Sequence, residues 1–214
     1  MIYITAGCLS IILVMLDIVW TTLTTRGEGL ISASVSGGFR KVARLAMRSG
    51  HRMSELVGSV SLMALGAVWL AGLWAGWVLI FLGLPDAITH SQRPTSDIYD
   101  LVYFVGFTLS TLGIGDITPR GAVAQLATAF ASFNGLLVVT LVVTYAISVV
   151  SGVVARRVLA YEIYLVGEEN GDFLAKFASV NDFSEWVASI KKDLIFCTEQ
   201  RLAYPILDNF VAKE

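Results

Sequence analysis

The residues with the clearest chemical potential form the stretch Thr111-Leu112-Gly113-Ile114-Gly115-Asp116, in which two glycines stand two positions apart after a threonine. Successive backbone carbonyls point to one side only when the chain alternates between right-handed and left-handed conformations. Glycine adopts the left-handed conformation without steric cost. The spacing therefore predicts one row of carbonyls from residues 111–114, with the Thr111 hydroxyl at its inner end. Four such rows around an axis could replace the water shell of a monovalent cation.

The stretch resembles the signature Thr-x-Gly-Tyr-Gly-Asp of potassium channels, which are the established example of a carbonyl-lined filter. The resemblance covers about residues 56–154 and includes positions that support the family's filter and its outer mouth: Tyr103, Phe104, Thr108, Ser110 and Asp116, the last in an Asp-x-x-Pro exit sequence. It implies that K⁺ is the bound and transported ion, and that it is held at the filter positions Thr111, Leu112, Gly113, Ile114 and Gly115.

Ile114 departs from the family, which usually carries Tyr or Phe at this position. The departure removes the ring or hydroxyl that braces the filter, although the carbonyl is kept. Two readings follow, a K⁺-selective channel and a weakly selective monovalent cation channel.

Composition indicates a membrane protein. The chain has 214 residues, of which 56% are hydrophobic and 15% are charged, whereas soluble domains carry about 25% charged residues. Cys8 and Cys197 have no spacing that suggests a metal site or a disulfide, and we interpret both as packing residues.

Residues 1–25 predict a transmembrane helix, because Ile2–Leu23 is apolar and long enough to cross about 30 Å of hydrocarbon. It lacks the basic start and cleavage site of a signal peptide, so we expect it to be retained. Asp17 is the exception in this helix. A structural partner on another helix is the favoured interpretation, and a gating or proton-sensing role is the alternative.

Residues 26–55 predict a basic cytosolic linker. Gly27–Gly38 is interpreted as a Gly/Ser connector, followed by an amphipathic helix from Phe39. Its basic residues are Arg40, Lys41, Arg44, Arg48 and Arg52. Such a helix is expected either to lie on anionic lipid or to be a solvated connector.

Residues 56–154 predict the pore domain, which begins with an uncharged outer helix over Leu56–Leu84. Gly72 and Gly76 form a small-xxx-small pair that would let another helix approach closely. A helix over Asp97–Ser110, capped by Thr95 or Ser96, is too short to cross a bilayer and is expected to be the re-entrant pore helix.

The inner helix is predicted over Ala122–Val154, with Arg156-Arg157 ending the crossing. Thr140, Thr144 and Ser148 form a hydroxyl stripe that we expect to face the cavity. Gly135 is the expected hinge, with helix packing as its alternative, and Gly152 is a second candidate for a bend.

Residues 155–214 predict a small helical cytosolic tail. Asn181 is expected to cap a helix that carries Phe183, Trp186, Val187, Ile190 and Leu194 on one face, and Pro205 is expected to end it. Glu168–Gly171 is interpreted as a loop.

The predicted fold is thus an all-α membrane protein with three transmembrane helices, a re-entrant pore helix and filter loop, and a helical tail. The bias of Lys and Arg places the N-terminus outside and the tail in the cytosol of a multi-pass protein of the cell membrane. One filter loop per chain implies a homotetramer. The expected partners are further copies, lipid and monovalent cations, with no cofactor and no nucleic acid.

Other function classes explain less of the sequence. A non-conducting membrane adaptor or regulatory subunit would account for the tail but not for the two-glycine loop. His51 and His90 lie apart, with no nucleophile, base or metal-ligand spacing beside them, so an enzyme is not expected.

Overall fold

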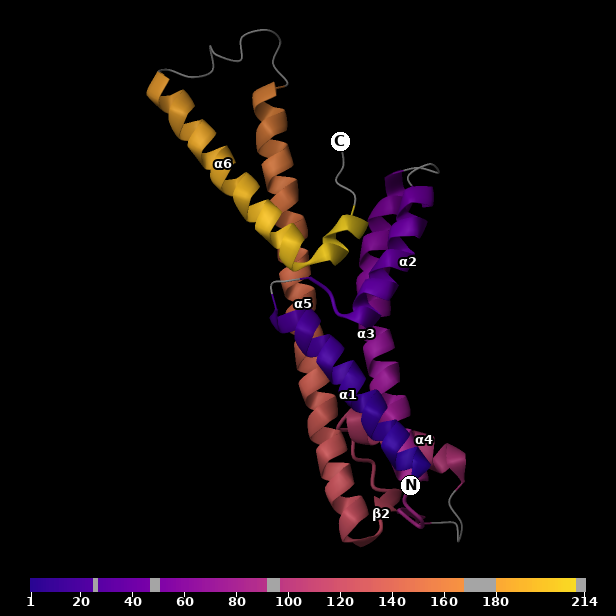
Figure 1. Cartoon of the computed structure of the whole chain (residues 1–214). Coiled ribbons are helices and arrows are strands. Elements are labelled where there is room, and N and C mark those ends of the chain that lie inside the picture. Colours follow the sequence, from indigo (N-terminus) through magenta and orange to yellow (C-terminus); the bar gives the residue numbers. More distant parts are fainter. Residues whose placement is uncertain (25–26, 47–50, 92–96, 168–179, 211–214) are drawn as a thin grey trace. The chain divides into compact units, whose positions relative to one another are not determined.

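The computed structural model describes all residues except 25–26, 47–50, 92–96, 168–179 and 211–214. Its elements in chain order are α1 (Ile2–Leu23), α2 (Leu30–Ala46), α3 (His51–Leu82), β1 (Ile88–His90), α4 (Ile98–Leu109), β2 (Ile117–Pro119), α5 (Gly121–Gly167), α6 (Val180–Ala203) and the 3-10 turn η2 (Pro205–Asn209) (Figure 1). The expected helical membrane fold is confirmed.

The chain divides into two compact units. Unit 1 contains Met1–Thr22, Gly29–Ser32 and Ala64–Thr144, and unit 2 contains Leu23–Glu28, Ala33–Met63 and Tyr145–Glu214. α3 and α5 are each divided between the two units, with one segment in each. Unit 1 holds the predicted filter, and unit 2 holds the tail.

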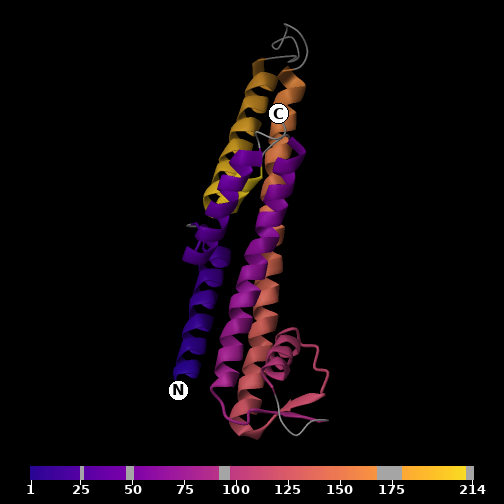
Figure 2. The same ribbon diagram turned by 90° about the vertical axis from the view of Figure 1, so that its right-hand side faces the viewer.

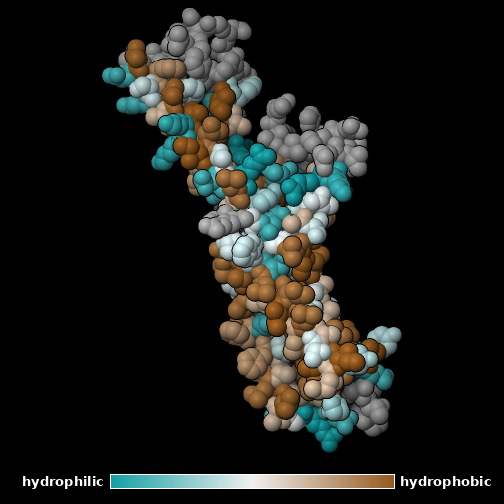
Figure 3. All heavy atoms as spheres, viewed as in Figure 1, coloured by the Kyte–Doolittle hydropathy of each residue, from teal (hydrophilic) through white to brown (hydrophobic). Residues whose placement is uncertain are grey.

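Three helical segments are long and apolar enough to cross a membrane: Ile2–Leu23, Leu56–Leu82 and Gly121–Leu165. On α1 the side chains of Leu9, Ile12 and Leu16 are more than half exposed, and hydrophobic residues dominate much of the surface seen in Figure 3. Hydrocarbon is the solvent in which such surfaces are stable. The prediction of three crossings is confirmed.

Glycines bring α1 onto α3 within unit 1. A methyl group on Gly72 would lie 2.9 Å from Val14, and one on Gly76 would lie 2.7 Å from the Ile11 side chain. A methyl group on Gly7 would lie 2.5 Å from the Gly76 carbonyl oxygen. The predicted close approach at this small-residue pair is confirmed, and the approaching helix is α1.

Asp17 joins three helices and is buried, with 6% of its surface exposed. Its carboxylate accepts hydrogen bonds from the Trp69 indole at 2.9 Å, the Ile31 backbone N–H at 2.7 Å and the Ser32 backbone N–H at 3.2 Å. The Ser32 hydroxyl donates to the same carboxylate. The structural interpretation of Asp17 is therefore confirmed, because each polar contact lies on a neighbouring element of the same unit.

The hydrogen bonds of Asp17 also explain why α2 begins earlier than predicted. The interpretation of Gly27–Gly38 as a Gly/Ser connector is wrong, because α2 begins at Leu30 and runs through Gly37 and Gly38. The first N–H groups of a helix need acceptors from elsewhere, and Asp17 supplies them from α1. The expected basic face is described only at Arg40 and Lys41; the side chains of Arg44, Arg48 and Arg52 lie outside the described residues.

Two short strands form a ribbon that the all-α prediction omitted. β1 and β2 pair antiparallel, with Ile88 opposite Pro119 and His90 opposite Ile117. Each strand has three residues, which is too short to leave a clear alternating pattern in the sequence. The ribbon ties the chain before α4 to the chain after the predicted filter.

The helices α5 and α6 differ from expectation in two places. α5 has 47 residues and continues past Arg156-Arg157 to Gly167, so these arginines mark no helix end. α6 begins at Val180, one residue before the expected cap Asn181, and ends at Ala203 before Pro205 as predicted. Its less exposed face carries Phe183, Trp186, Ile190 and Cys197, whereas Val187 and Leu194 are exposed. The expected loop at 168–171 lies outside the described residues.

Candidate pore-loop site

The short helix α4 is anchored by aromatic side chains in unit 1. The rings of Phe81 and Phe104 pack edge to face at 5.2 Å, and Phe104 contacts Phe107 in the same manner at 5.3 Å. The Trp74 indole donates a hydrogen bond to the Val102 carbonyl at 3.0 Å. These contacts attach a helix of 12 residues, too short to cross a bilayer, to the outer helix α3, as expected for a re-entrant pore helix.

The N-terminus of α4 is capped by its own residues. Asp97 occupies the N-cap, and the Asp100 carboxylate accepts the Asp97 backbone N–H at 3.3 Å. Thr95 and Ser96, the expected caps, lie outside the described residues. The two carboxylates favour this helix end, whose N–H groups carry partial positive charge.

The predicted filter begins directly where α4 ends. Ser110 is the C-cap, and the Leu112 N–H donates to the Phe107 carbonyl at 2.9 Å. Thr108 is buried on α4, whereas residues 110–115 are exposed in the isolated chain. The loop that follows α4 is therefore not covered by other parts of the same chain.

The loop backbone alternates in handedness. Positive φ angles occur at Thr111 (58°), Gly113 (55°) and Gly115 (85°), and Leu112 and Ile114 between them have none. The left-handed conformation expected at both glycines is confirmed. Thr111 was not expected to share it, because a β-branched residue at positive φ is strained. Such strain persists only where the surroundings hold it, and it gathers at functional sites.

The outer end of the loop lies beside α4 and is tied to the ribbon. The Tyr103 hydroxyl interacts electrostatically with the Asp116 carboxylate, and this carboxylate accepts the Ile117 N–H at 3.0 Å. The Asp116 carbonyl accepts the Ser91 N–H at 3.0 Å. Figure 2 shows α4 and the two strands together near the ends of α3 and α5. The predicted support residues Tyr103 and Asp116 are thus brought together.

Residues 67–152 match a protein family model described as Ion channel. This segment contains α4, the alternating loop and its ribbon. This segment is similar to an ion channel domain, and we refer to residues 67–152 by that name. The resemblance to the channel pore family is therefore confirmed for this part of the chain.

The similarity to one curated relative extends beyond the ion channel domain. This relative is a Bacillus subtilis (strain 168) protein described as an uncharacterized membrane protein, YdjJ, and it is 32% identical over 211 residues. The match covers 96% of this chain and 62% of the relative, so the chain spans less than two thirds of that protein's length. No solved structure matches the chain at a comparable level.

A cavity of about 270 Å³ lies beside the loop of the ion channel domain. Its lining comes from α4, the loop, β2 and α5, and includes Phe104, Thr108, Gly113, Thr118 and Ser132. A large aromatic side chain that braced the filter would need space of this kind. Ile114, which stands at the position of that aromatic residue, is not among the residues that line the cavity.

Gly135 of the ion channel domain lies against the end of α4. A methyl group there would overlap the Leu109 carbonyl oxygen and lie 2.8 Å from the Leu109 Cα. α5 is helical on both sides of Gly135. Its packing interpretation therefore has direct geometric support, and its role as a hinge stays a prediction.

The expected hydroxyl stripe lies on α5. Thr140 donates to the Leu136 carbonyl and Thr144 to the Thr140 carbonyl, each at 2.9 Å. Both threonines are exposed in the isolated chain, and Ser148 is half-buried. Because the threonine hydroxyls are satisfied within the helix, the stripe can face either lipid or water, and its cavity role stays a prediction.

Sequence reasoning missed three parts of this arrangement. The positive φ of Thr111 has no local signal, since threonine normally avoids that conformation. The ribbon joins β1 to the filter exit across a separation that no short pattern records. The proximity of Tyr103 and Asp116 could have been found from the two residue types, because a tyrosine hydroxyl and a carboxylate near one loop end can pair.

Proposed function

We propose that four copies of this chain form a K⁺-selective channel that conducts passively through the loop of residues 111–115. The alternation of handedness at Thr111, Gly113 and Gly115 is the observation that carries the proposal. A backbone of this form directs consecutive carbonyls to one side, which is the arrangement an ion needs when it leaves its water shell.

The mechanism follows from the oxygens that such a loop offers. The carbonyls of residues 111–114 and the Thr111 hydroxyl replace hydration water in successive cages. Several weakly held K⁺ ions occupy the file, and their mutual repulsion moves them along. No side-chain charge binds the ion in this scheme, so entry and exit stay fast.

The tetramer is supported by what one chain leaves uncovered. Leu112 is 66% exposed and Ile114 is 52% exposed, although both are large aliphatic residues at the centre of the loop. Neighbouring loops around a fourfold axis would cover them, and a single chain supplies only one of the four carbonyl rows that a closed cage needs.

Weaker selectivity for K⁺ over Na⁺ is the second candidate. It is favoured by the cavity beside the loop and by Ile114, because a filter that lacks an aromatic brace can widen or narrow around different ions. The proximity of Tyr103 to Asp116 opposes this reading, since an interaction between the two would restrain the outer end of the loop against α4.

The membrane orientation belongs to the same proposal. We place the N-terminus outside, and α2 and the tail in the cytosol of a cell-membrane protein, because Arg40, Lys41, Arg156 and Arg157 then lie on the inner side. Arg40 and Lys41 of α2 would be available to anionic lipid head groups.

The test is K⁺ flux through full-length protein reconstituted in vesicles. Gly115→Ala would force a side chain into a left-handed position, at about 1–2 kcal/mol per copy, and should abolish flux while the protein still inserts and assembles. Gly38→Ala is the matched control, because a methyl group there meets nothing within 4 Å and needs no positive φ. Normal flux through Gly115→Ala would remove the filter assignment.

A further inference from the structure

The end of the chain packs along the cytosolic part of α5 in unit 2. We name residues 204–209 the C-terminal splint; they comprise Tyr204 and η2. Ile206, Leu207 and Asn209 in this segment have 0% exposure. A turn so fully buried is part of the core of unit 2.

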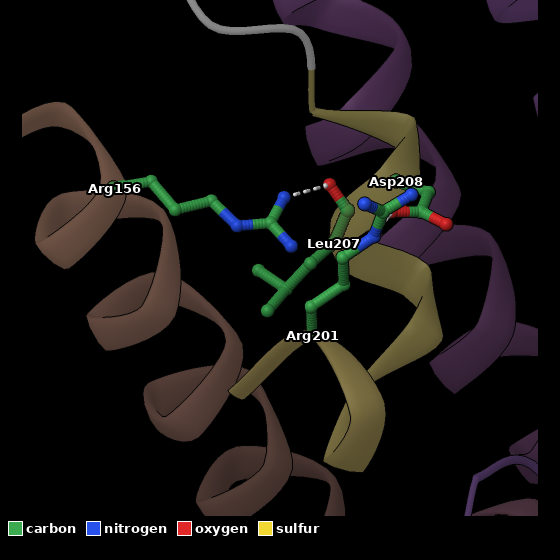
Figure 4. A network of polar contacts seen from close by, with 4 residues as sticks. All are labelled: Arg156, Arg201, Leu207 and Asp208. Atoms are coloured by element: carbon green, nitrogen blue, oxygen red, sulfur yellow. Dashed lines mark hydrogen bonds and ion pairs between the residues drawn. The ribbon is translucent and has the colours of Figure 1, made fainter. Parts of the chain in front are cut away.

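The splint touches α5 at three levels. The Tyr204 ring packs edge to face on Tyr145 at 5.7 Å. A methyl group on Gly152 would lie 3.0 Å from the Leu207 side chain, so Leu207 fits where Gly152 has no side chain. The Arg156 Nη1 donates to the Leu207 carbonyl at 3.0 Å, as Figure 4 shows. From Tyr145 to Arg156 these contacts cover about 16 Å of helix.

The contacts therefore lie on both sides of Gly152. A helix bends at a residue where its side-chain packing and backbone support are weakest, and glycine is such a residue. Bending at Gly152 would move Tyr145 relative to Arg156. One rigid turn cannot keep both contacts during that movement, so the splint must release at least one of them.

The splint is itself held at its other end. The Asn209 side-chain amide donates to the Ser36 carbonyl of α2 at 3.5 Å, and the Phe210 ring lies over Gly58 of α3. Arg201 of α6 forms an ion pair with Asp208 at 2.8 Å (Figure 4). Residues 204–210 thus connect the part of α5 around Gly152 to α2 and to the beginning of α3 within one chain.

We propose that the C-terminal splint holds α5 straight across Gly152 and that its release permits the bend that opens the cytosolic end of the pore. This inference rests on the proposed channel function and adds a control element to it. The splint acts on the gate, and the filter in unit 1 keeps its own geometry. Loosening the splint should therefore raise open probability without changing the current through an open channel.

The test compares Leu207→Ala with Leu202→Ala in full-length protein that carries Cys8→Ser. Leu207 fills the space at Gly152, whereas Leu202 is 61% exposed on α6. Cys197 reports docking, because its thiol is buried on α6 near Arg156. The readouts are the rate at which N-ethylmaleimide labels Cys197 and single-channel open probability in planar bilayers.

Leu207→Ala should label about tenfold faster and raise open probability about tenfold at unchanged unit conductance, and Leu202→Ala should do neither. Faster labelling of Leu207→Ala without a rise in open probability overturns the proposal, and so does unchanged labelling. If the parent protein passes no current while the labelling difference persists, the channel function itself fails and the docked splint stands.

A second variant covers the case in which Leu207→Ala does not assemble. Gly152→Cys with Leu207→Cys, in protein with both native cysteines changed to Ser, can be bridged by a short bifunctional methanethiosulfonate. Bridged channels should stay closed and should reopen after a reductant breaks the bridge. Bridged channels that open normally contradict the proposal.

Discussion

Gly135→Ala is the substitution that separates packing from hinge motion in α5. The added methyl group would lie 2.8 Å from the Leu109 Cα and closer still to its carbonyl oxygen. Both are backbone atoms, so no side-chain rotation relieves the overlap. Leu109 is the last residue of α4, and Thr111 follows two positions later. The substitution therefore acts on the inner end of the filter.

The size of the effect follows from this geometry. Ordinary contact begins at 3.4 Å, so α5 and the end of α4 must separate by roughly 1 Å to restore van der Waals spacing. Overpacking of this kind costs about 1–3 kcal/mol per site, or about 4–12 kcal/mol over four copies. About 1.4 kcal/mol at the ion sites is already a tenfold loss in ion affinity.

Single-channel recording of reconstituted protein is the appropriate assay. Gly135→Ala should lower unit K⁺ conductance at least tenfold. Gly66→Ala is the control, because its methyl group would lie 3.1 Å from a side-chain atom of Val142, which can move. Unchanged conductance with altered open probability would refute the packing argument and support the hinge.

Three further substitutions or conditions test other contacts. Trp69→Phe removes the indole donor to Asp17, a charge-assisted bond of about 1.5–3 kcal/mol, and should lower the Tm in detergent by roughly 5 °C without altering conductance; an unchanged Tm would show that this bond contributes nothing. Tyr103→Phe removes the hydroxyl that interacts with the Asp116 carboxylate. It should reduce selectivity for K⁺ over Na⁺, measured as a shift in reversal potential, and an unshifted potential would exclude bracing by this pair. Burial raises the pKa of the Cys197 thiol, so less thiolate is present near pH 8. The midpoint of the maleimide labelling rate against pH should therefore lie above pH 8.5, the ordinary pKa of an exposed cysteine; a midpoint at or below that pH contradicts the buried environment.

The sequence predicted the parts of this protein that depend on local pattern. Apolar runs of sufficient length located the three crossings, and the two glycines located the loop and its left-handed positions. The small-residue pair at Gly72 and Gly76 predicted a close helix contact. Each of these signals lies within one continuous segment of the chain, where spacing determines geometry.

The parts that the sequence did not predict depend on contacts between distant residues. α2 begins at Leu30 because Asp17, thirteen positions earlier, accepts its first N–H groups. Thr111 takes a left-handed conformation that its own side chain disfavours. Leu207 is buried because Gly152 leaves room for it. Composition and periodicity carry no record of such pairings.

The reversal potential with K⁺ on one side of a planar bilayer and Na⁺ on the other tests the central claim most directly. Carbonyl cages that replace the hydration shell of K⁺ predict a potential set by K⁺, with little current carried by Na⁺. A potential near zero, or one set by the anion, would contradict the account.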